Sequence, residues 1–249
     1  MRGVDRHSDV CVIECPVALD PDSMNRLQKS IHCALDDDAT KYILLKGSSD
    51  AYIFCHSMSL AFVASDPSDR ELSASFQMLS DIAMSINHSN KPTIAMVSGS
   101  VIAGGVGLVA ACDIVLADLH ANFSLSAGLY GLLPGVIIPF ILQRVSQSKL
   151  KYMIFTADTV RGEKAVQWGL SDQYFSNEVS MHHYVAKLFK ALRRIHASSV
   201  SNTKKLLSVL AHKQLANLGI ELSLASIADP ACKKVIKDYI TYGILPSTR

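Results

Sequence analysis

Residues 98–110 read SGSVIAGGVGLVA, and this glycine-rich stretch constrains the fold more than any other part of the chain. It follows an apolar run typical of a strand, Thr93–Val97, and leads into a short expected helix that ends near Ala111. Glycines at such a junction permit positive φ angles and close approach of the backbone to a ligand. The first N–H groups of a helix have no partner within it, so they stabilise an anionic oxygen. The segment Gly99–Gly107 therefore predicts a site for such an oxygen.

Three other interpretations of the glycines compete with this one. Gly105 to Ala110 matches the dinucleotide-binding pattern GxGxxA, but the strand expected before it ends at Val97, too early, and the candidate acid Asp118 follows too soon. Serine hydrolysis is disfavoured because the chain has no GxSxG motif and no ordered Ser/His/Asp set. The third interpretation, that the glycines only allow a helix to pack tightly on a strand, stays open.

Outward from this stretch, apolar runs alternate with helical patterns. Asp20 or Asp22 is expected to cap a helix through about Leu35, and Ser68 or Asp69 one through about Ile86. After Pro134 the pattern becomes helical almost to the end, with breaks near Gly162, Gly169 and Pro230. Further strands are expected at Val10–Cys15, Tyr42–Lys46, Tyr52–Cys55, Asp113–Ala117 and Phe123–Leu125. This order predicts an α/β core followed by a helical C-terminal part.

Composition limits the function classes. The 249 residues are 49% hydrophobic, enough for one sizeable core, and only 18% charged, which favours an oligomer whose subunits cover part of the surface. A net charge of +2 argues against a dedicated nucleic-acid binder. The polar start Met1–His7 and the interrupted apolar run Leu129–Leu142 predict neither a signal peptide nor a membrane span, so we expect a cytoplasmic protein without membrane association. The cysteines lack metal-site spacing and are expected to be reduced and mostly buried: Cys11, Cys15, Cys33, Cys55, Cys112 and Cys232.

Several motifs together resemble the enoyl-CoA hydratase/isomerase (crotonase) superfamily. They fall in the expected order over roughly residues 40–175: Lys91–Gly99, Ala103–Gly105, Ala111–Asp118, Ala121–Ser124, Gly131–Gly135 and Ala165–Leu170. The resemblance implies an α/β crotonase fold (ClpP/crotonase-like), a spiral of ββα units with C-terminal trimerisation helices. We expect residues 1–190 to form the spiral core and residues 191–249 the helical part, in a homotrimer or a dimer of trimers.

Within the superfamily, the chain looks most like the dehydratases of polyketide β-branching. These enzymes act on a 3-hydroxy-3-methylglutaryl group held on an acyl carrier protein. The stretches that carry the likeness are Phe54-Cys55, Phe123–Ser126, Pro139–Leu142, Leu192–Ile195 and Asp229-Pro230. The resemblance implies an acyl-thioester substrate and no separate cofactor, because CoA or phosphopantetheine is part of the substrate.

The resemblance also places the oxyanion hole of the family at the backbone N–H groups of Met58 and Gly104. Reactions next to a thioester pass through an enolate, whose negative charge such donors stabilise. At three positions where relatives carry acids the chain has none: Gly107 and Ala127 replace the two glutamates of hydratases, and Ser59 replaces an aspartate. Dehydration needs a positioned base and acid, so these losses put the reaction in question.

Few side chains are available to replace the missing acids. His56 lies beside the expected oxyanion donor and titrates near neutrality, so it is a tentative catalytic residue. Tyr130 is a tentative proton donor. The simpler interpretation is an aromatic side chain packed in the core, with its hydroxyl already hydrogen-bonded. Cys55 is expected to be a buried small residue rather than a nucleophile, because no activating base is evident.

Three functions remain open at this stage. Dehydration of a 3-hydroxy-3-methylglutaryl-type thioester follows from the resemblance. Decarboxylation of a glutaconyl-type thioester is favoured by the missing acids, since loss of carbon dioxide generates the enolate without a base. However, the lysine and histidine of related decarboxylases have no clear counterpart in Ser57–Arg70 or Asp229–Lys237. The third hypothesis is a catalytically impaired homologue with a binding or structural role.

A basic stretch near the end bears on the partner. Residues 179–220 contain no acid, and they include Lys187, Lys190, Arg193, Arg194, Lys204, Lys205 and Lys213. Such a surface attracts a phosphate-bearing partner, CoA or an acidic carrier protein, although a solvated helix face explains it equally well. The family segment that contacts CoA is altered at Val17–Asp22, which favours a carrier-protein substrate.

Overall fold

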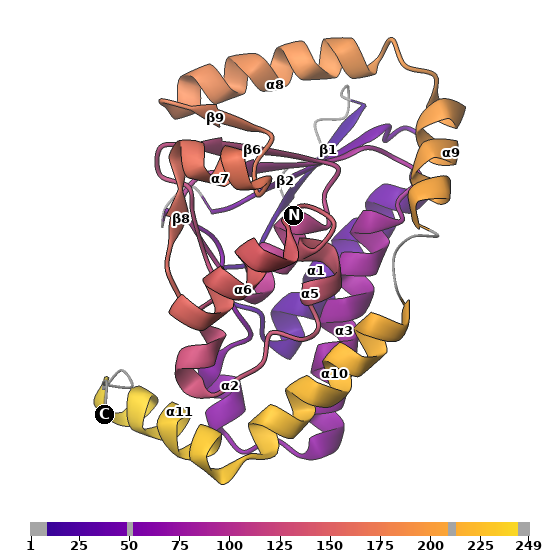
Figure 1. Cartoon of the computed structure of the whole chain (residues 1–249). Helices are drawn as coiled ribbons and strands as arrows, with labels where there is room; N and C mark the ends of the chain where they lie inside the picture. Colours follow the sequence, from indigo (N-terminus) through magenta and orange to yellow (C-terminus); the bar gives the residue numbers. More distant parts are fainter. Residues whose placement is uncertain (1–8, 49–51, 209–212, 244–249) are drawn as a thin grey trace.

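The computed structural model describes residues 9–48, 52–208 and 213–243, and its strands form two sheets (Figure 1). The first is an all-parallel sheet of five strands in the order β1-β2-β4-β6-β9, with bounds Val10–Glu14, Tyr42–Lys46, Thr93–Val97, Ile114–Asp118 and Gln173–Phe175. The second has the order β3-β5-β7-β8, with bounds Ile53–Cys55, Ser100–Ile102, Asn122–Ser124 and Val160–Arg161. Among the strands of the described ranges, only β8 runs antiparallel to its neighbour.

From β2 to β7, consecutive strands alternate between the two sheets, and this alternation generates a spiral. β2, β4 and β6 each lie in the first sheet, and the strand that follows each of them lies in the second. The corner between β4 and β5 requires a glycine: Gly99 has φ +93°, and a Cβ there would lie 2.0 Å from the Tyr52 carbonyl oxygen. The spiral of ββα units implied by the resemblance is confirmed.

Both faces of the parallel sheet are covered, as buried parallel strands require. On one face lie α1 (Pro21–Asp36) and α3 (Asp69–Asn87), whose N-caps are Asp20 and Ser68. On the other lies α8 (Glu178–Leu192), seen across the top of Figure 1. It buries Met181, Val185 and Phe189 against Tyr42, Leu44, Ile94, Met96 and Leu116 of the sheet. The expected caps and helix ends agree with the structure to within about two residues.

The remaining helices are short or lie toward the C-terminus. Their bounds are α2 Leu60–Ala64, α4 Gly104–Ala110, the 3₁₀ helix η1 Ser126–Tyr130, α5 Ile138–Ile141, α6 Gln147–Thr156, α7 Gly162–Trp168, α9 Ala197–Ser208, α10 Lys213–Ala228 and α11 Pro230–Tyr242. In Figure 1, α10 and α11 extend along the lower side of the molecule, and α11 lies beside α2. None of the helices in the described ranges combines the length and hydropathy needed to cross a bilayer.

Two sequence-based expectations about the strands are wrong. The list of expected strands omits one in the glycine segment, where Ser100–Ile102 forms β5. The region after Pro134 was expected to be helical, but it contributes β8 and β9. Strands of two or three residues are too short to show a periodicity. They form by pairing with other strands, β5 with β3 and β7, β8 with β7 and β9 with β6, which is a property of the tertiary structure.

The cysteines agree with the sequence-based expectation. All six are free thiols; Cys15, Cys55, Cys112 and Cys232 are buried and Cys33 is exposed. The polar start Met1–His7 lies outside the described residues. The division at residue 190 and the trimer stay predictions; α8 runs through that boundary to Leu192.

An ion pair whose lysine is buried attaches α9 to the core. The Lys204 ammonium lies 2.6 Å from Asp113 Oδ2, and its side chain is only 9% exposed. It also donates to the carbonyl oxygens of Ile86 and Lys91 at 3.4 Å. Because a buried cation needs its partners, the pair fixes where α9 lies.

Replacing Lys204 with methionine is expected to lower the free energy of unfolding by about 1–2 kcal/mol, less than for a fully buried pair because the Asp113 side chain is 29% exposed and also accepts hydrogen bonds from Thr93. Urea unfolding of the full chain measures this change. Lys187→Met on the exposed face of α8 is the matched control, with an expected change within about 0.5 kcal/mol. Equal stability of the two variants would show that the pair contributes nothing to the attachment of α9.

Candidate functional site

The N-terminus of α4 lies at the centre of the site, and its backbone is strained. Ala103, which precedes the helix, has φ +43° and ψ −104°. A residue with a Cβ in this region costs about 1–3 kcal/mol, and such strain is concentrated at functional sites. Ala103 is followed directly by Gly104, the first residue of α4, whose N–H has no partner within the helix.

The Met58 N–H lies close to that of Gly104. Leu19 pairs with the chain on either side of Met58: its N–H donates to Ser57 O, and its carbonyl accepts from Ser59 N, both at 3.1 Å. In such a bridge the central residue directs its own N–H to the opposite side. A Cβ added at Gly104 would lie 3.8 Å from Met58 N, so the two amides adjoin the same small volume. In the described part of the chain, neither amide has a backbone acceptor.

The other glycines of the segment serve packing. A Cβ at Gly105 would lie 2.2 Å from the Cys55 carbonyl oxygen, so only glycine lets α4 pack on β3. A Cβ at Gly107 would lie 2.2 Å from Ile137 Cγ2. The interpretation of the glycines as packing residues is thus correct for Gly105 and Gly107, while Gly104 alone adjoins Met58. The dinucleotide interpretation was rejected partly on a wrong premise, because β5 does precede the glycines. The other objection to the dinucleotide interpretation holds, because the helix α4 has only seven residues.

Two cavities meet at Met58, and Gly104 lines the first of them. The first, of about 50 Å³, is largely apolar, and its lining includes Val63, Phe76, Leu79, Leu133, Ile137 and Ile227. The second, of about 350 Å³, has a more polar lining that includes His56, Ser59, Ser126, Tyr130 and Tyr239. Both are lined by Ser57, Met58, Ala103, Ala127 and Leu132. The arrangement suits a ligand with an apolar end, a carbonyl at the amides and a polar reacting group.

His56 and Tyr130 both line the second cavity, as their tentative assignment requires. His56 Nε2 lies 2.7 Å from Ser100 Oγ, and partial burial lowers the pKa of the imidazole. Tyr130 is half-buried, and burial, with a further contribution from a hydrogen bond to Tyr239, raises its pKa to about 12. At neutral pH the site thus offers a neutral imidazole, which can accept a proton, and a neutral phenol, which can donate one.

Tyr239 is a lining residue that sequence reasoning missed. It comes from α11, and its ring lies 5.2 Å from that of Tyr130 at an interplanar angle of 64°. No motif marks Tyr239 in the sequence, because its place beside the cavity depends on how α11 packs. Ile137, which fills the space next to Gly107, was missed for the same reason.

The three positions that lack acids differ in their surroundings. Ala127 lines both cavities and is 8% exposed, so a longer side chain there would enter them. Gly107 lies against Ile137, so this position has no room for a longer side chain. Ser59 caps α2 by accepting from Phe62 N at 3.3 Å. No Asp or Glu is among the described residues that line either cavity.

Cys55 is fully buried, and burial raises the pKa of its thiol to about 12. A thiol with such a pKa supplies almost no thiolate at neutral pH. The geometry therefore agrees with a packing role for this residue.

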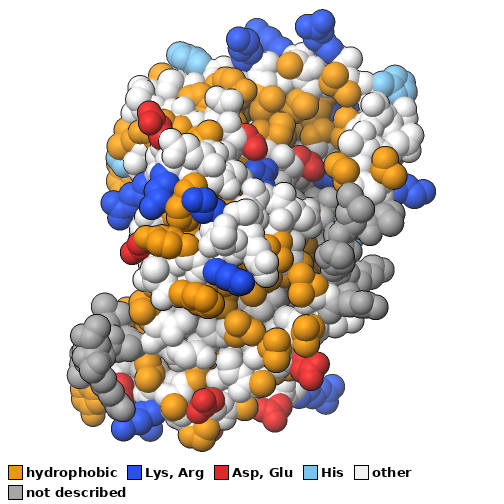
Figure 2. All heavy atoms as spheres, in the orientation of Figure 1, with side chains coloured by type: hydrophobic (Ala, Val, Ile, Leu, Met, Phe, Trp, Pro, Cys, Tyr) orange, Lys and Arg blue, Asp and Glu red, His pale blue; other side chains and the backbone are white. Residues whose placement is uncertain are grey.

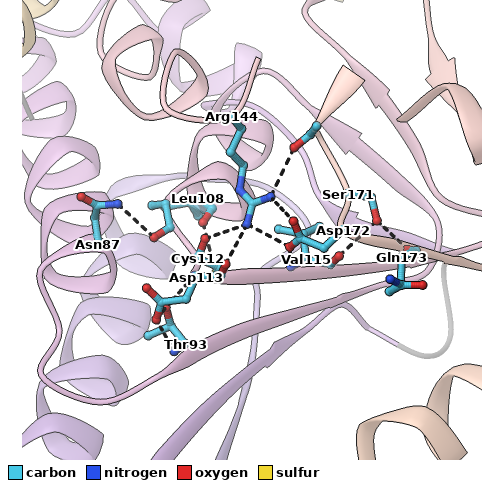
Figure 3. Close-up of polar contacts among 12 residues, drawn as sticks. Asn87, Thr93, Leu108, Cys112, Asp113, Val115, Arg144, Ser171, Asp172 and Gln173 are labelled. Carbon is cyan, nitrogen blue, oxygen red and sulfur yellow. Dashed lines mark hydrogen bonds and ion pairs between the residues drawn. The ribbon is translucent and has the colours of Figure 1, made fainter. Parts of the chain in front are cut away.

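A third cavity, of about 410 Å³, is polar, but its charged groups are paired with one another (Figure 3). Arg144 donates to the carbonyl oxygens of Cys112, Asp113 and Gly169, and forms an ion pair with Asp172 at 3.2 Å. Asp172 Oδ2 also accepts from Val115 N. This network ties the end of α5 to the loops around β6 and is structural.

The basic stretch 179–220 does not form one continuous surface. Arg193 pairs with Asp9, and Lys204 is buried against Asp113. Figure 2 shows Lys and Arg side chains in separate groups, one of them over α8. The Lys213 side chain lies outside the described residues. Across the described ranges, no group of three His, Cys, Asp or Glu side chains is arranged to hold a metal ion.

Known proteins similar to this chain share one family. The family model described as enoyl-CoA hydratase/isomerase matches residues 13–231. The chain is 30% identical over 180 residues to the bacillaene synthase dehydratase PksH of Bacillus subtilis (strain 168), which covers 71% of this chain and 68% of that protein. It is 27% identical over 210 residues to the crotonyl-CoA hydratase of Syntrophomonas wolfei, covering 83% and 75% of the two chains.

Solved structures show the same fold. The polyketide biosynthesis enoyl-CoA hydratase pksH from Bacillus subtilis superposes with a TM-score of 0.85 at 24% identity, covering 96% of each chain. A methylmalonyl-CoA decarboxylase in complex with 2-nitronate-propionyl-CoA superposes with a TM-score of 0.81 at 17% identity, covering 97% of this chain and 95% of that one. At these identities the likeness concerns the fold, which hydratases and a decarboxylase share.

Proposed function

Because the chain belongs to the enoyl-CoA hydratase/isomerase (crotonase) family, we propose that it binds an acyl thioester with the carbonyl oxygen between the N–H groups of Met58 and Gly104. The observation that supports this most directly is the juxtaposition of the two amides, neither with a backbone acceptor in the described chain. Donors preorganised around a developing enolate lower the barrier of reactions next to a thioester. The strained Ala103 holds one of these donors in place.

The reaction proposed first is dehydration of a 3-hydroxyacyl thioester of the 3-hydroxy-3-methylglutaryl type. His56 takes the α-proton, and the electron pair moves to the thioester oxygen. The C–O bond then breaks, and Tyr130 protonates the departing hydroxyl, so that water leaves and the α,β double bond forms. The proton on His56 returns to the Tyr130 oxygen, which restores both groups. The name of the relative from Bacillus subtilis, a dehydratase of bacillaene synthase, favours this reaction and a place in polyketide assembly.

Decarboxylation of a glutaconyl-type thioester is the second candidate. The C–C bond breaks, carbon dioxide leaves, and the enolate held at Met58 and Gly104 takes a proton at its α-carbon. The observation that favours it is the lack of any Asp or Glu among the described lining residues, since no carboxylate then repels an acidic substrate. Tyr130 would donate the proton in this reaction as well.

The acyl group is proposed to arrive on the phosphopantetheine arm of an acyl carrier protein, with CoA as the other source. Incubation with 3-hydroxy-3-methylglutaryl and 3-methylglutaconyl thioesters, on a carrier protein and on CoA, tests this. A loss of 18 mass units from the acyl group identifies dehydration, and a loss of 44 identifies decarboxylation. Binding without turnover would instead favour the catalytically impaired homologue.

The role of His56 predicts a specific pH dependence. A base must be neutral, so kcat/KM is expected to fall tenfold per pH unit below the pKa of His56. Burial holds this pKa below its ordinary value of about 6.5, so the falling limb lies under that pH. The same shift makes the folded state bind fewer protons than the unfolded state, so stability also falls as the pH drops through this range.

Replacing His56 with glutamine is expected to lower kcat about 10²–10⁴-fold and to abolish this limb, because glutamine does not titrate but still reaches Ser100. Initial rates between pH 5 and 8 measure both effects. A variant that kept the acidic limb would show that another group is the base.

A further inference from the structure

The geometry points to Ser100 as a positioning residue that accepts a hydrogen bond from Nε2–H of His56, which leaves Nδ1 of that imidazole as the proton acceptor of the site. This inference rests on the proposed function and deepens it, because His56 is the residue proposed to take the α-proton. A neutral imidazole carries its ring proton on one of two nitrogens, and only the other nitrogen can act as a base. The hydrogen bond that one ring nitrogen makes sets which of the two carries the proton.

His56 is held at its backbone and at its ring. It directly follows β3, and its backbone N–H donates to the carbonyl oxygen of Val17 at 2.8 Å. Ser100 is the first residue of β5, the strand that pairs with β3. The two side chains meet across these neighbouring strands, and His56 Nε2 lies 2.7 Å from Ser100 Oγ, at the short end of the hydrogen-bond range. The contact therefore fixes the direction of the imidazole.

The two ring nitrogens of His56 have different surroundings. His56 lines the second cavity, whereas Ser100 is not among the described residues that line it. Nε2 is thus directed to a side chain outside the cavity, and within the described ranges Nδ1 has no hydrogen-bond partner. Nδ1 is therefore the nitrogen that remains available to a bound acyl group.

These surroundings also favour one direction for the hydrogen bond. If Ser100 donated to Nε2, the ring proton would lie on Nδ1, where the described chain offers no acceptor. A donor left without a partner away from water costs free energy. If Nε2–H donates to Ser100 instead, the ring proton has its partner and Nδ1 keeps a free lone pair. The Ser100 side chain is only partly buried, so its own O–H can turn toward water.

A hydroxyl orients the ring in a different way from a carboxylate. A carboxylate beside an imidazole favours the imidazolium and raises its pKa, whereas a neutral hydroxyl adds no charge. Among the described residues, the other titratable side chains on the cavity wall are Tyr130 and Tyr239, and the nearby Asp20 carboxylate accepts from Ser23 N at the start of α1. Ser100 thus sets the tautomer of a base that stays neutral near pH 7.

Ser100→Ala in the full chain tests the inference by steady-state kinetics on the thioesters named above. We expect kcat to fall about tenfold while KM changes less than about threefold, because the orientation of the base is lost and binding is not. Ser100→Thr is the matched variant: it keeps the hydroxyl, and a β-branched residue suits a strand. Its kcat is expected to stay within about threefold of the wild type, and a thermal unfolding curve of each variant shows that both fold.

A second measurement depends on neither turnover nor a Ser100 variant. With 15N-labelled histidine, NMR at about pH 8, above the pKa of an ordinary histidine, distinguishes a ring nitrogen that carries a proton from one that does not. The signals lost in His56→Gln identify His56. In the wild type we expect a protonated Nε2 and an unprotonated Nδ1. In Ser100→Ala both signals should move toward the average of the two tautomers, and in Ser100→Thr they should stay in place.

Two results would overturn the inference: a protonated Nδ1 in the wild type, or an active wild type whose Ser100→Ala variant is equally fast. The outcome that refutes the proposed function is a different one. A wild type that turns over none of the thioesters, but shows the expected tautomer and loses it in Ser100→Ala, would exclude the proposed reactions while supporting the assigned direction of the His56–Ser100 hydrogen bond.

Discussion

Replacing Gly104 with alanine is expected to lower kcat/KM about 10²–10³-fold, a loss comparable to that of one oxyanion donor, because the added methyl keeps the thioester oxygen from reaching the Gly104 N–H. The added methyl would lie 3.8 Å from Met58 N, in the volume that the thioester oxygen needs. Its closest contact, 2.8 Å, is with Leu19 Cδ1, the end of a flexible side chain that can move aside. The expected defect therefore lies in catalysis rather than in folding, and steady-state kinetics with a thermal unfolding curve separates the two.

Gly128→Ala is the matched control for this experiment. Gly128 lies in η1 next to Ala127, and a Cβ there meets only Ile154 O, at an ordinary 3.4 Å. We expect its kcat/KM to stay within about twofold of the wild type. If Gly104→Ala were as active as Gly128→Ala, the thioester oxygen would not bind at these amides.

Replacing Ala127 with glutamate is expected to raise the rate of dehydration by about 10²-fold. Ala127 lies on the wall common to both cavities, so the new carboxyl would enter them beside the bound acyl group. Burial raises the pKa of a carboxyl, which brings it closer to the value that suits an acid or base at neutral pH. Product formation by mass spectrometry, with a loss of 18 units, measures the gain.

Ala127→Gln separates the chemistry of the carboxyl from its size. It fills the same space without an ionisable group, and its rate is expected to stay at or below that of the wild type. Equal rates for Ala127→Glu and Ala127→Gln would show that the reacting carbons are not next to residue 127. Gly107→Glu should give no such gain, because its side chain would have to displace Ile137, 2.2 Å from the added Cβ.

These contrasts change how the missing acids are understood. In the sequence, Gly107 and Ala127 look like two equivalent losses. In the structure, Ile137 has taken the space beside Gly107, so that position is closed, while Ala127 opens onto the cavity. Of these two positions, only residue 127 therefore has room for an acidic side chain that reaches the cavity.

The sequence by itself determined the elements whose signals are local. The caps Asp20 and Ser68 and the run Thr93–Val97 predicted helices and a strand that the structure confirms. The ordered motifs around the glycine segment predicted the crotonase spiral, because sharp corners and close helix–strand contacts need particular residues at particular positions. The family resemblance also predicted that the amides of Met58 and Gly104 adjoin, and a Cβ at Gly104 would lie 3.8 Å from Met58 N.

Only the tertiary structure decided what faces those amides. β5, β8 and β9 are too short to carry a pattern and form by pairing with edges that distant segments supply. Tyr239 and Ile137 reach the site from α11 and from the loop before α5, and no local signal marks them. The physical reason is that periodicity and capping act over a few residues, whereas a cavity is lined by side chains whose neighbours are set by packing across the whole chain.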